Sequence, residues 1–221
     1  MPAGRSDDTL TAASGVALPE ARGVQEAGSD MRVCLVGVGC VGKTTIGRLL
    51  AGRLGVPFFD LDEEIERHFA TSIERLRARQ LTAYSYRAET AEVLRALLEA
   101  NADCVVAVAP SGLRDAYLRV LKKVDCVVVA IEDAAENILR RITFYDVDSR
   151  PLEVQLSERE RRLHLAEIRK DINYFRKSYQ RADLHADIAG LDAEGSAARI
   201  QELLAAHGGG RPSAISVASR P

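Results

Sequence analysis

The sequence lacks an uninterrupted apolar stretch of the roughly 20 residues that a membrane-spanning helix needs. Its first thirty residues carry charges and glycines where a secretory signal would need an apolar core. It also lacks a charge bias, because 30 basic and 32 acidic side chains give a net charge of −2, without the excess positive charge of polyanion-binding proteins. We therefore expect a cytoplasmic protein that binds neither membranes nor nucleic acid.

The four cysteines lack the spacing of a metal site. Cys34, Cys104 and Cys126 begin or lie within apolar, strand-like runs, which predicts buried, reduced thiols. Cys40 lies instead in a glycine-rich segment. Two interpretations of Cys40 stay open: it is a small loop residue, or it is a thiol whose oxidation blocks the binding of a ligand to this segment.

A chain of 221 residues with average composition predicts one globular domain. Residues 1–30 are rich in Ala, Gly, Ser and Asp and show no periodicity, and three glycines open a Ser- and Pro-containing end. We expect a disordered leader at 1–30, a folded domain at 31–206 and a disordered tail at 207–221.

Residues 37–45 read G-V-G-C-V-G-K-T-T and fit the phosphate-loop pattern G-x-x-x-x-G-K-[ST]. An apolar run at 33–36 precedes this motif, and apolar residues at helical spacing follow it, so the context is strand, loop and helix. Backbone N–H groups of such a loop surround phosphates, and the N-terminus of the following helix favours the same anions. A turn that only joins a strand to a helix is the alternative.

The chemistry of a phosphate loop assigns roles to its residues. Lys43 would contact phosphate oxygens, Thr44 would supply a hydroxyl ligand to Mg²⁺, and Thr45 would help to start the helix. The predicted nucleotide-binding residues of the loop are Gly37, Gly39, Cys40, Val41, Gly42, Lys43, Thr44 and Thr45.

Apolar runs alternate with amphipathic patterns along the chain, which predicts an α/β fold with a parallel sheet covered on both faces. We expect strands at 32–36, 57–60, 104–109, 126–131 and 183–188, and helices at 43–54, within 62–100, and at 112–122, 133–144, 157–181 and 194–206. Ligands of such sheets bind beyond the carboxyl ends of the strands, where the phosphate loop lies.

Asp60 and Asp62 follow the second predicted strand, on the side of the phosphate loop. In an extended chain they point the same way, so one could hold Mg²⁺ through water while the other orients or deprotonates an acceptor hydroxyl. The alternative is that Asp62 only caps the helix that follows.

Residues 37–62 resemble a known family. Their pattern, G-x-x-x-x-G-K-T-T-I-G-R-L-L-A-x-x-L-G followed by F-x-D-x-D-x-x-I-E, is similar to the shikimate kinases of the nucleoside-monophosphate-kinase-like group. Gluconate and adenylate kinases share the loop and are less similar in the paired aspartates. The resemblance implies a three-layer α/β/α phosphate-loop fold with a five-stranded parallel sheet, a small acceptor-binding helical subdomain at about 62–100 and a lid at about 146–160.

The resemblance also implies site residues on the acceptor side. Asp60 lies near the metal, and Asp62 receives the hydroxyls of shikimate. Tyr86-Arg87 is similar to the family's Phe-Arg pair, whose arginine binds the shikimate carboxylate. Arg150, in Arg-Pro-Leu, would close over the transferring phosphoryl group.

Three further arginines come from the same resemblance. Arg176, in Arg-x-x-Tyr, is similar to the second carboxylate-binding arginine. Arg141, or its neighbour Arg140, would stack on adenine. For each arginine a solvated surface position is the alternative.

The chain departs from the family after its third strand, where three glycines are replaced by Ala109, Pro110 and Ser111. Proline has no N–H to donate, so the middle amide cannot serve the substrate in the same way. Ser111 could supply a hydroxyl to the substrate or cap the next helix.

Two more departures follow. Thr90 occupies the position, three residues after Arg87, at which the family carries a carboxylate, so Arg87 lacks that local partner.

Beyond Pro151, a capping box of Ser157 and Glu160 precedes a long helix. Its apolar stripe indicates core packing, with a dimer contact as the alternative; the stripe comprises Leu165, Ile168, Ile172, Phe175 and Tyr179.

These features predict an ATP-dependent kinase that phosphorylates a hydroxyl of shikimate or of a related hydroxylated acid. Mg²⁺ would be its cofactor, ATP its co-substrate, and Lys43, Asp62 and Arg150 its catalytic residues. We expect a monomer or a weak homodimer acting in aromatic amino acid biosynthesis. The alternative is a nucleotide-binding regulatory module without shikimate kinase activity, an interpretation that the Ala109-Pro110-Ser111 replacement favours.

Overall fold

The computed structural model describes residues 31–110, 113–142, 144–145, 151–152 and 154–208. The expected leader at 1–30 and nearly all of the expected tail at 207–221 lie outside these ranges. Two predicted site residues, Ser111 and Arg150, also lie outside them.

Five parallel strands form the central sheet, in the order β2-β3-β1-β4-β7. The strands are rich in β-branched residues, and β1 and β3 are almost wholly buried, as expected where helices cover both faces. This confirms the predicted five-stranded parallel sheet. The strand bounds are β1 Arg32–Val36, β2 Phe58–Asp60, β3 Cys104–Ala107, β4 Val127–Glu132 and β7 Leu184–Asp187.

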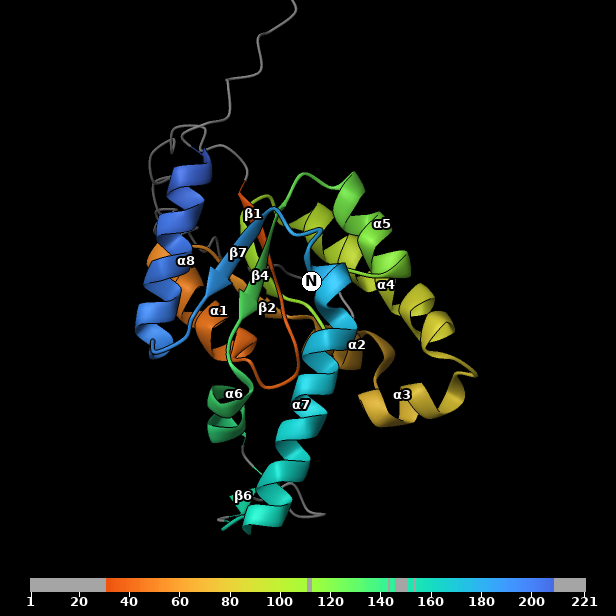
Figure 1. The fold of residues 1–221 in the computed structure, drawn as a ribbon. Helices are drawn as coiled ribbons and strands as arrows, with labels where there is room; N and C mark the ends of the chain where they lie inside the picture. The colour runs from red at the N-terminus through yellow and green to blue at the C-terminus, as the bar shows by residue number, and fades with distance from the viewer. Residues whose placement is uncertain (1–30, 111–112, 143, 146–150, 153, 209–221) are drawn as a thin grey trace, which may run out of the picture.

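Helices cover both faces of this sheet and make three layers (Figure 1). On one side α1 (Lys43–Leu54) packs against α8 (Ala193–Gly208), and on the other α4 (Ala83–Ala100) packs against α5 (Asp115–Lys123). The helices α2 (Leu61–Phe69) and α3 (Ile73–Arg79) lead from β2 to α4, within the range expected for the acceptor-binding subdomain.

Three predicted boundaries are wrong. The helix expected at 133–144 is α6 (Ala135–Arg141); it ends because Ile142 is extended, and β5 (Phe144–Tyr145) then pairs antiparallel with β6 (Pro151–Leu152). Strand β3 ends at residue 107, although Val108 and Ala109 remain buried. Helix α5 begins at residue 115, after the segment containing Pro110.

The long helix α7 (Glu158–Tyr179) begins at the predicted capping box of Ser157 and Glu160. Its apolar stripe packs within the chain, because Leu165 joins residues of α6 and Phe175 stacks on the ring of Tyr179. Core packing is therefore confirmed for the stripe. In the part of the chain that the structure describes, no helix is both long and apolar enough to span a membrane.

Candidate active site

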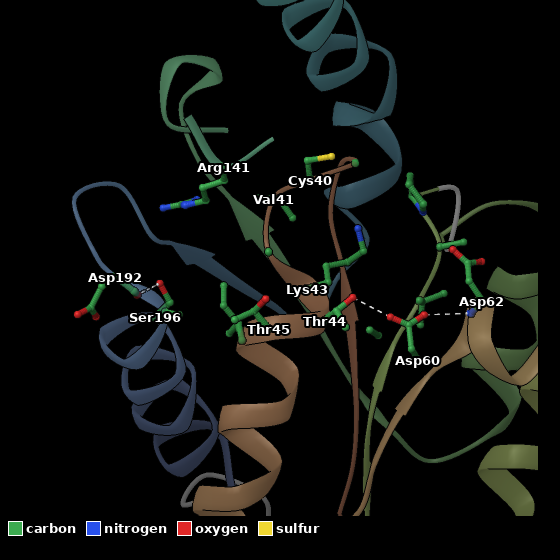
Figure 2. Close-up of a pocket in the computed structure, with 18 residues that line it drawn as sticks. Cys40, Val41, Lys43, Thr44, Thr45, Asp60, Asp62, Arg141, Asp192 and Ser196 are labelled. Atoms are coloured by element: carbon green, nitrogen blue, oxygen red, sulfur yellow. Dashed lines mark hydrogen bonds between the residues drawn. The ribbon is translucent and has the colours of Figure 1, made fainter. Parts of the chain in front are cut away.

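A cavity of about 680 Å³ opens at the carboxyl ends of the strands, above the N-terminus of α1 (Figure 2). It runs from Arg141 and the start of α8 at one end to Asp62 and Pro110 at the other. The lining therefore brings together most of the predicted phosphate-loop residues with Asp60, Asp62 and Arg141; Gly37 itself lies just behind it.

The backbone of the phosphate loop requires its glycines. A Cβ on Gly37 would lie 2.8 Å from the carbonyl oxygen of Ile131 and 2.9 Å from Cγ1 of Val41, so only glycine fits there. Gly42 has φ +105° at the position that precedes α1, and no side chain caps that helix. The first N–H groups of α1 thus remain available to an anion in the cavity.

The ammonium group of Lys43 is held against the loop. Its Nζ donates to the carbonyl oxygens of Gly37 at 2.9 Å and Val38 at 3.0 Å. Burial lowers the pKa of Lys43 to about 8, although the negative charges of Asp62 and Asp60 act in the opposite direction. A phosphate ligand would replace these carbonyl partners with full negative charge and favour the protonated form.

Thr44 and Asp60 meet where a metal would be needed. Thr44 Oγ1 donates to Asp60 Oδ2 at 2.7 Å, which places a hydroxyl oxygen and a carboxylate oxygen side by side at the phosphate loop. Mg²⁺ prefers such hard oxygen ligands and takes its remaining ligands from phosphates and water. The described residues contain no group of three His, Cys, Asp or Glu side chains that could form a metal site by themselves.

The structure corrects the expected geometry of the two aspartates. Helix α2 begins at Leu61, so the chain is not extended between them, and Asp60 rather than Asp62 is the capping residue. Asp60 Oδ1 accepts from the backbone N–H of Asp62 at 3.1 Å. Asp60 therefore connects the loop hydroxyl of Thr44 to the first turn of α2.

Asp62 is left free to face the cavity. Within the described residues its Oδ1 atom is buried without a hydrogen-bond partner. Burial, with a further contribution from Asp60, raises the pKa of Asp62, and the positive charges of Arg77 and Lys43 oppose that rise. A buried carboxylate oxygen that lacks a partner marks a position where a ligand hydroxyl would be accommodated.

Arg141 lies at the opposite end of the cavity, near Asp192 and Ser196 (Figure 2). It forms an ion pair with Asp133, whose side chain is fully buried, and also contacts the carbonyl oxygen of Leu191 at 3.4 Å. This location is compatible with the predicted contact to adenine, which stays a prediction.

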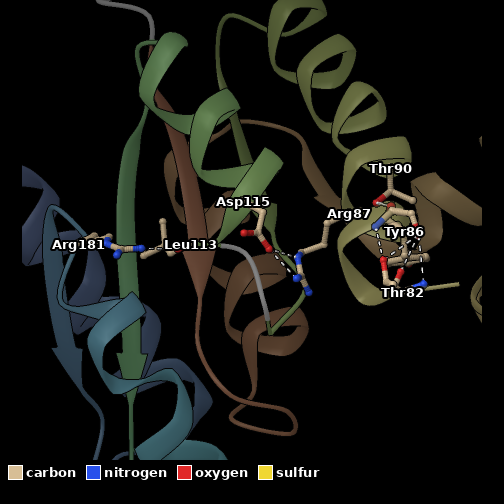
Figure 3. A network of polar contacts seen from close by, with 8 residues as sticks. Thr82, Tyr86, Arg87, Thr90, Leu113, Asp115 and Arg181 are labelled. Atoms are coloured by element: carbon tan, nitrogen blue, oxygen red, sulfur yellow. Dashed lines mark hydrogen bonds and ion pairs between the residues drawn. The ribbon is translucent and has the colours of Figure 1, made fainter. Parts of the chain in front are cut away.

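Arg87 is not among the residues that line the cavity. Its Nε and Nη2 atoms lie 2.9 and 2.6 Å from Asp115 Oδ2, at the start of α5 (Figure 3). Asp115 has φ +50°, and the Arg87 side chain is 13% exposed. Arg87 therefore has a partner 28 residues away in the chain in place of the local carboxylate that the sequence lacks, and its contact to the acceptor carboxylate stays a prediction.

Arg176 is also absent from this cavity. It donates to Asn173 Oδ1 at 2.8 Å and lines a separate cavity of about 590 Å³ with His185 and Glu132. The structure thus places neither of the two predicted carboxylate-binding arginines in the lining of the cavity that holds Lys43 and Asp62, although the cavity of Arg176 reaches the phosphate loop at Val38.

Sequence reasoning missed cavity residues at the start of α8. The Asp192 side chain accepts from the N–H of Gly195 at 2.7 Å, and its carbonyl oxygen accepts from the Ser196 hydroxyl at 2.6 Å. An aspartate just before a helical pattern is a recognisable capping signal.

Comparison with known proteins gives consistent matches. A family model described as shikimate kinase matches residues 39–205. The chain is 32% identical over 153 residues to the shikimate kinase of Zymomonas mobilis, covering 69% of this chain and 81% of that protein. It superposes with a TM-score of 0.63 and 26% identity on the shikimate kinase of Acinetobacter baumannii in complex with shikimate, covering 80% of this chain and 93% of that one.

Two further sequence alignments with relatives are shorter. The chain is 41% identical over 69 residues to the shikimate kinase of Aquifex aeolicus, covering 31% of this chain and 40% of that protein. The alignment with the Salinibacter ruber shikimate kinase likewise spans 58% of that relative.

Proposed function

This chain belongs to the shikimate kinase family, and from that premise we propose that it transfers the γ-phosphoryl group of MgATP to a hydroxyl group of shikimate. The observation that carries the proposal is the buried, unpartnered Oδ1 atom of Asp62, which lines the same cavity as the phosphate loop. An acceptor hydroxyl bound there would lie in the cavity that receives the triphosphate. Protein groups in phosphoryl transfer mainly position the reactants and neutralise charge.

The phosphates of ATP would bind to the N–H groups of the phosphate loop and of the first turn of α1. Lys43, released from the carbonyl oxygens of Gly37 and Val38, would donate to phosphate oxygens. Its positive charge would offset the negative charge that the phosphate oxygens carry during transfer. Arg141, beside Asp192, would face the nucleoside end.

Mg²⁺ fits the pair of oxygen ligands formed by Thr44 and Asp60. When bound, the ion supplies neutralisation of the phosphate charge. Asp60 would keep its second oxygen on the N–H of Asp62 and so hold the start of α2 in place.

Asp62 would accept a hydrogen bond from the acceptor hydroxyl at Oδ1 and then take its proton. Burial favours this role because it raises the pKa of the carboxyl group and makes the carboxylate a better proton acceptor. Arg150, which lies outside the described residues, remains the proposed lid residue that reaches the transferring group.

The proposal extends to the setting of the reaction: a kinase of aromatic amino acid biosynthesis, in the cytoplasm, acting on ATP and shikimate as a monomer or weak homodimer. Nothing in the comparisons favours the nucleotide-binding module without activity. Pro110 in the acceptor-side lining keeps a related hydroxylated acid as the second candidate for the acceptor.

The test follows ADP release by the full-length protein with MgATP and shikimate. We expect release only with shikimate present and a loss of about 100- to 1,000-fold in kcat/KM for Lys43→Ala, because one preorganised charge is removed. Lys43→Arg and a no-acceptor reaction serve as controls, and a thermal melt checks folding. ATP binding without release for shikimate or any other hydroxy acid would contradict the proposal.

A further inference from the structure

Three of the four cysteines gather towards the amino ends of the central strands, away from the phosphate loop. Cys34 of β1 stands opposite Val128 of β4, and Cys126 comes two residues before Val128. Cys104 of β3 stands opposite Arg32, two residues before Cys34. Because residues two apart in a strand point to the same face, the strand register directs all three thiols to one face of the sheet.

Of these thiols, Cys34 and Cys126 are in contact with each other. The Cys34 thiol donates a hydrogen bond to the sulfur of Cys126. Cys126 Sγ in turn donates to the carbonyl oxygen of Leu121, in α5, at 3.5 Å. The Cys104 thiol donates instead to the carbonyl oxygen of Asn101 at 3.9 Å. Among the described residues, the three thiols do not form a group that could hold a metal ion.

The two thiols of the pair differ in their access to solvent. Cys34 is fully buried within β1, whereas Cys126 is only partly buried. Cys126 lines a cavity of about 470 Å³, which also contains Lys122, Lys123 and Arg181. A small molecule that enters this cavity therefore reaches Cys126 first, and reaches Cys34 only through it.

The two thiols also differ in acidity. The hydrogen bond from Cys34 lowers the pKa of Cys126, although burial and the negative charges of Asp183 and Asp125 oppose that change and Arg32 supports it. The same contact, together with burial, raises the pKa of Cys34 well above its usual value. Because the thiolate is the nucleophilic form of cysteine, Cys126 is the more reactive of the two, while Cys34 keeps its proton.

We propose that Cys126 is a modification site for hydrogen peroxide and that Cys34 converts its oxidised form into a disulfide. The Cys126 thiolate attacks one peroxide oxygen, the O–O bond breaks, and the departing hydroxide takes a proton to become water, which leaves a sulfenic acid. The sulfur of Cys34 then displaces the hydroxyl group, which departs as water with the thiol proton of Cys34. Two thiols and one peroxide thus give one disulfide and two waters.

Closure of the disulfide requires a small movement of residue 126. Residues offset by two positions on paired strands have Cα atoms about 8 Å apart, and a disulfide needs them within about 7 Å. Cys126 precedes Val127, the first residue of β4, so its backbone lies outside the strand and is free to approach β1. None of these residues lines the active-site cavity, and the inference does not depend on the proposed kinase reaction.

The experiment follows the thiols by mass spectrometry in the full-length protein. All variants carry Cys40→Ser, which removes the exposed thiol of the phosphate loop. This parent is compared with versions that also carry Cys126→Ser, Cys34→Ser or Cys34→Ala, and with Cys104→Ser as matched control, because Cys104 is a buried thiol on the same face. Each protein is treated with hydrogen peroxide, the remaining thiols are alkylated, and a thermal melt checks folding.

We expect the parent to lose the mass of two hydrogen atoms, to keep one alkylatable thiol and to yield a peptide pair joined through Cys34 and Cys126. Cys104→Ser should form the same bond at the same rate. Cys126→Ser should react at least about tenfold more slowly, because its most reactive thiol is gone. The two Cys34 variants should stop at a sulfenic acid on Cys126, which dimedone traps.

Three results would overturn the inference: a parent in which peroxide leaves Cys126 unmodified, further oxidation of Cys126 while Cys34 stays reduced, or a disulfide that includes Cys104. If neither Cys34 variant folds, the joined peptides of the parent still decide the matter. The mass measurement requires no turnover, so a disulfide in a protein that releases no ADP with shikimate would refute the kinase reaction alone.

Discussion

The phosphate-binding part of the cavity is built from residues that follow one another in the chain, 39–46, whereas the acceptor end combines Asp62 of α2 with residues 107–110 at the end of β3. At the nucleotide end, residues 37–45 fix their own geometry through glycine backbone angles and the start of α1. Outside this lining, Arg87 of α4 pairs with Asp115, 28 residues further along the chain. The phosphate-binding part therefore depends mainly on local backbone geometry, whereas the acceptor end depends on how separate elements pack together.

The largest expected effect concerns the charge of Lys43 at the nucleotide end. With a pKa of about 8 in the free protein, Lys43 is protonated below that pH and loses its charge as the pH rises through it. Because phosphate binding favours the charged form, the Kd for MgATP should be constant below pH 8. It should then rise about tenfold for each further pH unit, as for any single deprotonation.

Titration calorimetry between pH 6.5 and 10 would measure this dependence. Lys43→Arg should remove the rise, because a guanidinium group keeps its charge over that range. Cys40→Ser excludes a contribution from the exposed thiol in the same loop. A rise that persists in Lys43→Arg would show that another group titrates.

The next largest effect concerns the buried hydrogen bonds of Thr90 in α4. Thr90, fully buried, donates to the carbonyl oxygen of Tyr86 at 2.8 Å (Figure 3). Its Oγ1 atom also lies 2.6 Å from the hydroxyl of Tyr117, which therefore donates to it. Thr90→Val keeps the shape of the side chain and leaves the buried Tyr117 hydroxyl without its hydrogen-bond acceptor. The free energy of unfolding should fall by about 1–3 kcal/mol.

Urea denaturation of Thr90→Val, Tyr117→Phe and the double variant tests this arrangement. The double variant should lose less stability than the sum of the two single losses, because no orphaned hydroxyl remains. Strict additivity would mean that the two side chains do not share a hydrogen bond.

The smallest effects come from a pair of glycines in α1. A Cβ on Gly47 would lie 2.5 Å from Cε2 of Phe58 and 3.1 Å from Cδ1 of Leu35, whereas a Cβ on Gly52 would meet no atom within 4 Å. Overpacking in Gly47→Ala should cost about 1–3 kcal/mol, of which the better helix propensity of alanine offsets up to about 1. Gly52→Ala should stabilise by about 0.5–1 kcal/mol.

Thermal unfolding of the two alanine variants decides whether α1 is pressed against the sheet beneath the phosphate loop. Equal melting temperatures would show that Phe58 and Leu35 rearrange at little cost. The comparison also separates packing from helix propensity, because both substitutions make the same chemical change in the same helix.

Local patterns predicted most of the fold. The apolar β-branched run before Gly37 and the capping box at Ser157 each depend on neighbours in sequence, and both elements begin where expected. The predicted continuation of the helix beyond Arg141 was wrong because pairing of β5 with β6 takes over there, a contact between segments that periodicity does not report.

In the candidate site, too, some contacts could be predicted from the sequence and others could not. The meeting of Thr44 with Asp60 could be predicted because both stand at the ends of adjacent elements on one edge of the sheet. The partner of Arg87 could not, because its own helix face offers no carboxylate at the expected spacing and Asp115 comes from another helix. Tertiary pairing of charged side chains leaves no periodic signal in the sequence.

One hydrogen bond connects helix α7 to the acceptor end of the cavity. The hydroxyl of Tyr179, at the end of α7, donates to the carbonyl oxygen of Pro110 at 2.6 Å, in the loop that lines the acceptor end. Near its other end, α7 packs against α6 through Leu165 and pairs Arg169 with Glu136, and α6 carries Arg141. Helix α7 is therefore a single rigid element that contacts both α6, which carries Arg141, and the loop that lines the acceptor end of the cavity.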